Sequence, residues 1–278
     1  ELQAIMKQFL LKHRLYRILL RGKGLEFEAY RKYEQDDDSS TIDWKASTRA
    51  NSLLVKQYRD ERNLKVVFLV DVGENMVFGS TEKLKCEYAA EVVGAFSHLI
   101  ISTGDRAGIV FFNQEVKDYI KPKGGNKNFH VLADRLTDAS LYGGRSDLKK
   151  AFDFALSYIS KNIDSLIIVS DFIYFNPSLI KPLHSIANKF ETVLLMIRDP
   201  VDNALPNVSG EIVIEDSQTG EQILVNPRLA KNIYQKSSSQ QREMIRHACA
   251  LGNIDLLELD TNEKFVPTLS EFLKGRIR

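Results

Sequence analysis

Residues 66–76 read VVFLVDVGENM, an apolar run that ends in a carboxylate followed by small and polar residues. Five consecutive apolar residues bounded by a polar turn are typical of a strand buried on both faces, as in a parallel sheet covered by helices. Ligand sites of such sheets lie beyond the carboxyl ends of the strands. The stretch therefore predicts a central strand over 66–70, with Asp71 at the edge of the sheet where a ligand would bind.

Two further segments point to the same edge. Residues 165–171, SLIIVSD, repeat the apolar run and end in Asp171, and residues 143–148, GGRSDL, place Ser146 between a glycine turn and a predicted helix. Hard cations such as Mg²⁺ take oxygen ligands in proteins. We therefore expect three loops to converge and their oxygen-bearing side chains to be able to hold one cation.

This pattern resembles the metal-ion-dependent adhesion site of von Willebrand factor A domains, in which a D-x-S-x-S segment, a Thr and an Asp come from three loops. The resemblance implies a bound Mg²⁺ or Mn²⁺ with four side-chain ligands here, Asp71, Asn75, Ser146 and Asp171. It also implies that a protein partner docks over the neighbouring residues, Gly73, Glu74, Gly144, Arg145 and Asp147. The chain departs from the pattern because Gly73 offers no side-chain oxygen and Asn75 offers an amide in place of a hydroxyl, so the predicted site is degenerate.

Two other readings of the aspartates remain open. Asp71 and Asp171 also fit a structural role, in which they cap helix starts or accept backbone N–H bonds at strand ends. An enzymatic alternative is a magnesium-dependent phosphohydrolase, in which strand-end aspartates position a metal-activated water. Against the enzyme, Asp71 has no second acid two residues on, and no Lys or His is assigned as acid or base. We therefore expect a non-enzymatic interaction module.

Strands and helices are predicted to alternate from residue 64 onward. The expected strands cover 66–70, 107–113, 117–121, 165–170, 192–197 and 254–259, and the expected helices cover 82–102, 127–136, 147–161, 178–189 and 227–251. A hairpin is expected around the turn at 216–220. Such alternation predicts an α/β fold with a doubly wound, mostly parallel sheet that is Rossmann-like and von Willebrand factor A-like.

The predicted domain organisation has three parts. Residues 1–24 are expected to form a basic amphipathic helix, and 25–63 together with 199–226 a small β-rich subdomain. Residues 64–198 and 227–278 are expected to form the von Willebrand factor A-like domain. Within the small subdomain, Asp43 is expected to be a polar anchor beside a packed Trp44.

A second resemblance covers residues 22 to about 275 and concerns the DUF58 family. The motifs that carry it are GKGLEF at 22–27, RKY at 31–33, DD at 37–38, IDW at 42–44, LVKQY at 54–58, RDP at 198–200, LP at 205–206 and TGE at 219–221. Members of that family are commonly encoded beside MoxR-type AAA ATPases. The resemblance therefore implies an adaptor, or a substrate, of a chaperone-like machine that assembles or matures other proteins.

Composition narrows the class of partner. The 278 residues include 38 basic and 37 acidic side chains, a balance that gives no field to attract nucleic acid, and no run is long and apolar enough to suggest a membrane span. Two cysteines, Cys86 and Cys249, predict no disulfide framework. We expect a cytoplasmic protein, and because the chain begins at Glu1, a segment upstream is the place where we expect any tether to the cytoplasmic membrane face.

Overall fold

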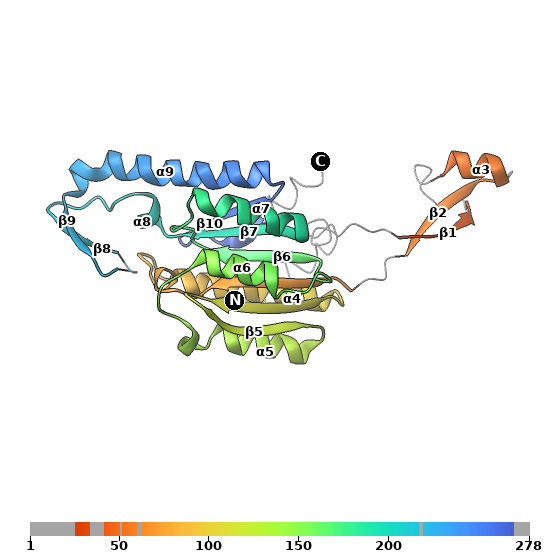
Figure 1. The fold of residues 1–278 in the computed structure, drawn as a ribbon, viewed down its shortest axis with the longest axis horizontal. Coiled ribbons are helices and arrows are strands. Elements are labelled where there is room, and N and C mark those ends of the chain that lie inside the picture. The colour runs from red at the N-terminus through yellow and green to blue at the C-terminus, as the bar shows by residue number, and fades with distance from the viewer. Residues whose placement is uncertain (1–25, 34–41, 51, 60–62, 217–218, 270–278) are drawn as a thin grey trace. The chain divides into compact units, whose positions relative to one another are not determined.

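The computed structural model describes residues 26–33, 42–50, 52–59, 63–216 and 219–269 (Figure 1). The predicted helix over 1–24 lies outside these residues. The chain divides into two compact units, one over Arg21–Asn63 and the other containing Leu64–Arg278. Each unit is described by itself.

The smaller unit is an antiparallel strand pair with one short helix. Strand β1 (Glu26–Lys32) pairs with β2 (Leu54–Arg59), and helix α3 (Trp44–Ala50) lies between them in sequence. Asp43 caps the helix, because its Oδ1 accepts the backbone N–H groups of Lys45 and Ala46 at 3.1 and 3.0 Å. The expected anchor role of Asp43 is thus observed, whereas Trp44 is 66% exposed and does not pack as expected.

The larger unit is built on a six-stranded sheet in the order β10-β7-β6-β3-β4-β5. Five strands are parallel and β5 is antiparallel at one edge. Their bounds are β3 Lys65–Asp71, β4 Arg106–Phe112, β5 Val116–Lys123, β6 Ser165–Ser170, β7 Glu191–Arg198 and β10 Asp255–Asp260. The strand order reverses direction on either side of β3, so the predicted doubly wound, mostly parallel α/β sheet is confirmed.

Helices cover both faces of this sheet. They are α4 Lys85–Ser102, α5 Asn126–Leu136, α6 Leu148–Ser157, α7 Ile180–Lys189, α8 Pro200–Asn203 and α9 Pro227–Leu251, with short 3₁₀ turns η2 Glu74–Met76, η3 Ala139–Leu141 and η4 Pro177–Leu179. Alternate residues of β3 face opposite layers: Val66 and Phe68 pack in the cluster that includes α4 and α5, and Val67 and Leu69 pack in the cluster that includes α6, α7 and α9. This two-sided burial explains why β3 reads as an unbroken apolar run.

The region after β7 differs from its predicted grouping. Strands β8 (Ile212–Glu215) and β9 (Gln222–Val225) form the expected antiparallel hairpin, and α9 follows it directly. Residues 199–226 nevertheless belong to the same compact unit as the sheet, and not to a subdomain shared with 25–63. Local bonds account for this: Tyr234 of α9 donates to the carbonyl of Val201, and Arg228 donates to Ser209.

Among the residues that the structure describes, no helix is both long enough and apolar enough to cross a bilayer.

Candidate functional site

The site lies where β3 and β6 end side by side. The two strands pair in parallel, with Val70 opposite Val169, so their carboxyl ends reach the same edge of the sheet. Asp71 is the last residue of β3, and Asp171 directly follows β6. Both carboxylates are buried, with 1% and 0% of their surface exposed. The predicted convergence of these two loops is therefore observed.

A third loop carries Ser146 to the same place. The backbone N–H of Glu74 donates to the carbonyl of Gly144 at 2.7 Å, and the N–H of Gly144 donates back to the Glu74 carboxylate at 3.1 Å. Gly143 and Gly144 have φ values of 114° and 77°, in a region that residues other than glycine rarely adopt. The glycine pair thus makes the turn that brings Ser146 against Asp71.

Asp71 accepts hydrogen bonds on both of its carboxylate oxygens. Oδ1 accepts from the N–H of Gly73 at 2.9 Å, and Oδ2 accepts from the hydroxyls of Ser170 and Ser146 at 2.7 and 2.8 Å. Burial, followed by the nearby charge of Asp171, raises the pKa of Asp71 to about 6, although these hydrogen bonds oppose the rise. The structural reading of Asp71, as an acceptor of a backbone N–H at a strand end, is thus observed.

Asn75 joins the two carboxylates. Its amide nitrogen donates to Asp171 Oδ1 at 2.9 Å and to Asp71 Oδ2 at 3.4 Å. The opposite orientation of the amide would place its oxygen against two carboxylates, so electrostatics favours the one observed. No donor among the described residues reaches the buried oxygen Asn75 Oδ1.

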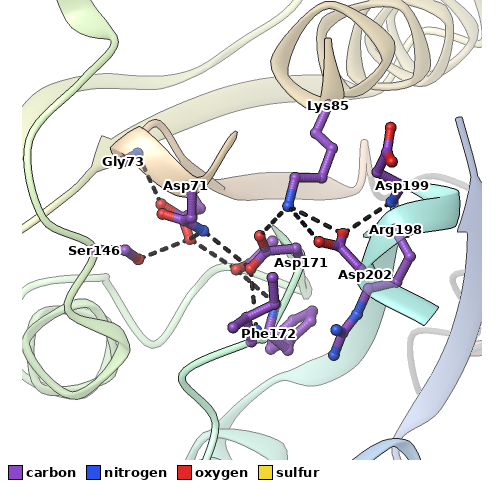
Figure 2. A network of polar contacts seen from close by, with 12 residues as sticks. Asp71, Gly73, Lys85, Ser146, Asp171, Phe172, Arg198, Asp199 and Asp202 are labelled. Carbon is purple, nitrogen blue, oxygen red and sulfur yellow. Dashed lines mark hydrogen bonds and ion pairs between the residues drawn. The ribbon is translucent and has the colours of Figure 1, made fainter. Parts of the chain in front are cut away.

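A lysine that no sequence motif indicated, Lys85, completes the site (Figure 2). Lys85, the first residue of α4, places its Nζ 2.6 Å from Asp171 Oδ2 and 3.0 Å from Asp202 Oδ2, and it is 1% exposed. Burial opposes its charge, but Asp171 and Asp202 outweigh burial and raise the pKa of Lys85. Lys85 and Arg198 in turn outweigh burial at Asp171 and lower the pKa of that carboxyl. Lys85 and Asp171 therefore form a charged pair inside the protein.

Asp202 responds differently from Asp171. Burial raises the pKa of Asp202, and the nearby Asp171 adds to the rise while Lys85 opposes it. Asp202 lies in α8, where its carboxylate also accepts the N–H of Asp199 at 2.9 Å. The shorter contact and the lowered pKa both mark Asp171 as the main partner of Lys85, with Asp202 as the second.

The turn after β6 is strained and is held by α9. Phe172 is fully buried and has φ of 52°, a conformation that costs a bulky residue on the order of 1–3 kcal/mol. The side chain of Gln241 donates to the carbonyls of Phe172, at 3.0 Å, and of Ile173. The oxygen of the same amide accepts from Arg198 at 2.7 Å. Gln241 thus links α9 to the ends of β6 and β7.

Gly73 is required by close packing. A Cβ at this position would lie 2.7 Å from Asn75 Oδ1 and 2.8 Å from the Cβ of Ser146, closer than real side chains approach. The serine that von Willebrand factor A domains carry here would therefore not fit without a shift of its neighbours. The absence of a side chain at position 73 and the presence of the Asn75 amide therefore depend on each other, because the amide fills the space that a side chain at 73 would need.

The predicted partner-binding residues differ in accessibility. Glu74, Gly144 and Arg145 are exposed, whereas Gly73 is buried beneath them. Asp147 is half-buried and its carboxylate caps α6 by accepting the N–H of Lys150 at 3.0 Å. Three of the five residues are thus free to meet a partner in this arrangement.

The residues present do not fit a divalent cation without rearrangement. Mg²⁺ takes about six oxygen ligands in near-octahedral geometry. Each oxygen of Asp71 and of Asp171 already accepts a hydrogen bond or the Lys85 ammonium. Among the described residues, no group of three or more His, Cys, Asp or Glu is placed to hold a metal ion. Binding of Mg²⁺ or Mn²⁺ stays a prediction, and it would require these contacts to open.

Comparison with known proteins gives the family. A family model described as "Protein of unknown function DUF58" matches residues 29–244. An uncharacterized protein of Mycobacterium tuberculosis is 26% identical over 265 residues, which cover 94% of this chain and 82% of that protein. An uncharacterized protein of Mycobacterium avium is 27% identical over 139 residues, which cover 49% of this chain and 79% of that protein.

Solved structures with a similar backbone arrangement have low sequence identity to this chain. The conserved hypothetical protein BatB from Bacteroides thetaiotaomicron is 10% identical, with a TM-score of 0.49, and the match covers 77% of this chain and 98% of that one. The VWA domain of SpRpn10 is 11% identical, with a TM-score of 0.44, and the match covers 74% of this chain and 92% of that domain. The fold assignment rests on the sheet itself. Because the family model spans most of the chain, the predicted membership is confirmed and the protein belongs to the DUF58 family.

Proposed function

We propose that this protein is a non-enzymatic adaptor that docks a protein partner at the carboxyl edge of its sheet. The partner that the family resemblance implies is a MoxR-type AAA ATPase, acting in the assembly or maturation of other proteins. The observation that carries the proposal is a set of large apolar side chains left exposed in segments that follow the carboxyl ends of β3 and β7. We call this set the apolar end surface; it comprises Val77, Phe78, Val208, Val213, Leu224, Leu229 and Ile233.

Most residues of the apolar end surface belong to the hairpin β8–β9 and to the start of α9, two elements that lie at the left end of the sheet unit in Figure 1. Val213 and Leu224 are direct cross-strand neighbours and are 59% and 65% exposed. Leu229 and Ile233 are one helical turn apart on α9 and are 81% and 76% exposed. Exposed groups of large apolar side chains mark protein interaction sites more often than chance placement does. They support docking of a protein at this end.

The buried cluster supports a non-enzymatic role. A catalytic acid, base or nucleophile must come within hydrogen-bonding distance of a substrate. Asp71 and Asp171 are closed off from solvent, and their oxygens are already engaged within the chain. No observation favours the phosphohydrolase alternative, which needs a metal and an attacking water at these carboxylates.

The test is a binding measurement by calorimetry between the purified chain and a purified MoxR-type AAA ATPase of the same organism, with and without EDTA. We expect binding in both conditions. We expect the double variant Leu229→Glu/Ile233→Glu to bind at least about tenfold more weakly, because it places charge in the apolar centre of the interface.

The matched control is Leu251→Glu. Leu251 is the last residue of the same helix, is 67% exposed, and lies at the other end of α9. This variant should bind like the parent chain. The proposal fails if the ATPase does not bind, or if Leu251→Glu weakens binding as much as the double variant does.

A further inference from the structure

A buried ammonium group lies against Asp171, one of the four predicted metal ligands, at the carboxyl end of β6. Lys85 is almost fully buried, and its Nζ contacts carboxylate oxygens from two separate elements, Asp171 after β6 and Asp202 in α8. A charge is costly to bury without partners, so this lysine is held there by the two carboxylates. The ammonium group thus bridges acidic groups from different loops, as a bound metal ion would.

The charges around Lys85 support the comparison of its ammonium group with a bound metal ion. Three buried or nearly buried carboxylates lie at the cluster, those of Asp71, Asp171 and Asp202; Lys85 contacts the last two, and the charge of Arg198 also acts on them. Without Lys85, the three carboxylates would face one arginine, an excess of negative charge that attracts a divalent ion. With Lys85, the excess is reduced and the oxygens of Asp171 are occupied.

The surrounding residues are shaped for this arrangement. Gly73 leaves room for the Asn75 side chain, since a Cβ at position 73 would collide with Asn75 Oδ1. The Asn75 amide then donates to both aspartates, which a serine hydroxyl, with its single hydrogen, could not do at the same time. Donors thus occupy the position where the related adhesion sites are expected to place oxygens and a metal ion.

We infer that Lys85 is a built-in substitute for the divalent cation, so that the site is held together by the chain itself and does not depend on a metal. The inference does not rest on the proposed partner, because its test involves metal ions alone. A metal ion exchanges with solvent, whereas Lys85 cannot leave. The carboxyl edge of the sheet is therefore fixed in one state irrespective of metal supply.

The test compares the parent chain with Lys85→Ala in two measurements. The first is thermal unfolding in the presence of EDTA, Mg²⁺ or Mn²⁺. The second is Mn²⁺ binding followed by electron paramagnetic resonance. The parent should bind no Mn²⁺ at this cluster and should keep the same Tm in all conditions. Lys85→Ala should have a lower Tm with EDTA, bind one Mn²⁺, and regain several degrees of Tm as the metal concentration rises.

Two further variants make the test decisive. Lys83→Ala removes a neighbouring lysine that is 44% exposed and paired with Glu91, and it should show no metal dependence. Lys85→Gln keeps a side chain of similar length without the charge, and it is used if Lys85→Ala does not fold. The inference is overturned if the parent binds one Mn²⁺ that Asp71→Asn removes, or if the folded Lys85 variants bind no metal and show no change of Tm with metal.

Discussion

At the scale of single residues, Gly73 decides whether the cluster can close. We predict that Gly73→Ala lowers the free energy of unfolding by about 1–3 kcal/mol, the usual effect of forcing an extra group into a packed site. The reason is the 2.7 and 2.8 Å contacts that a Cβ would make with Asn75 and Ser146. Urea unfolding followed by circular dichroism measures the change.

Gly94→Ala is the control for this prediction. Gly94 lies inside α4, and a Cβ there would meet nothing within 4 Å. The added methyl group should raise the free energy of unfolding by about 0.5–1 kcal/mol, because alanine favours the helix over glycine. Equal effects of the two substitutions would contradict the packing argument.

The sequence predicts individual site residues only in part. Asp71 and Asp171 could be selected because each ends an apolar run, and Ser146 because it follows a glycine turn. Lys85, Ser170 and Asp202 were missed because their partners lie 86 to 117 residues away in the chain, which no local pattern shows. One signal was present: Lys85 stands four residues before the buried Ala89 on the core-facing side of α4. A lysine on an apolar stripe is a buried charge that requires a partner.

At the scale of elements, Gln241 of α9 bonds the strained turn after β6. We predict that Gln241→Ala lowers the free energy of unfolding by about 1–3 kcal/mol, because it leaves the buried carbonyl of Phe172 and the guanidinium of Arg198 without this partner. Thermal and urea unfolding measure the loss. Gln240→Ala, at the exposed neighbouring position of the same helix, should change stability by less than about 0.5 kcal/mol. Similar losses for both variants would show that the effect belongs to the helix and not to the bonds.

Most elements of the sheet unit were predictable because their periodicity is strong. The strand over 66–70 is β3 without its two end residues, and the helix over 227–251 has the bounds of α9. Helix α3 was not predicted, because the aromatic residues around it suggested short strands, whereas the Asp43 cap sets the helix start. The grouping of 199–226 was wrong because this region bonds to α9 through pairs that are distant in sequence, such as Tyr234 and Val201, which no local pattern shows.

At the scale of the whole molecule, 38 basic and 37 acidic residues nearly balance. General charge repulsion is therefore small near neutral pH, and a few buried carboxylates dominate the pH dependence of stability. Asp71 has the opposite effect to Asp171. The pKa of Asp171 is lowered on folding, so its stabilising contribution is present above its ordinary pKa and is lost as the pH falls. The pKa of Asp71 is raised, so its contribution is largest at low pH and is lost as the pH rises from about 4 to about 6.

We predict that Asp71→Asn isolates this second contribution. Because the variant cannot ionise at position 71, its free energy of unfolding relative to the parent should rise with pH between about 4 and 6 and level off above about 7. A pKa raised from 3.8 to about 6 corresponds to a total rise on the order of 3 kcal/mol. Urea unfolding of both proteins across this range measures the difference. Added salt should leave it nearly unchanged, since Asp71 is 1% exposed and buried charges are screened little. A difference that stays constant from pH 4 to 7 would mean that the surrounding hydroxyls and the Asn75 amide compensate fully for the burial of this carboxylate.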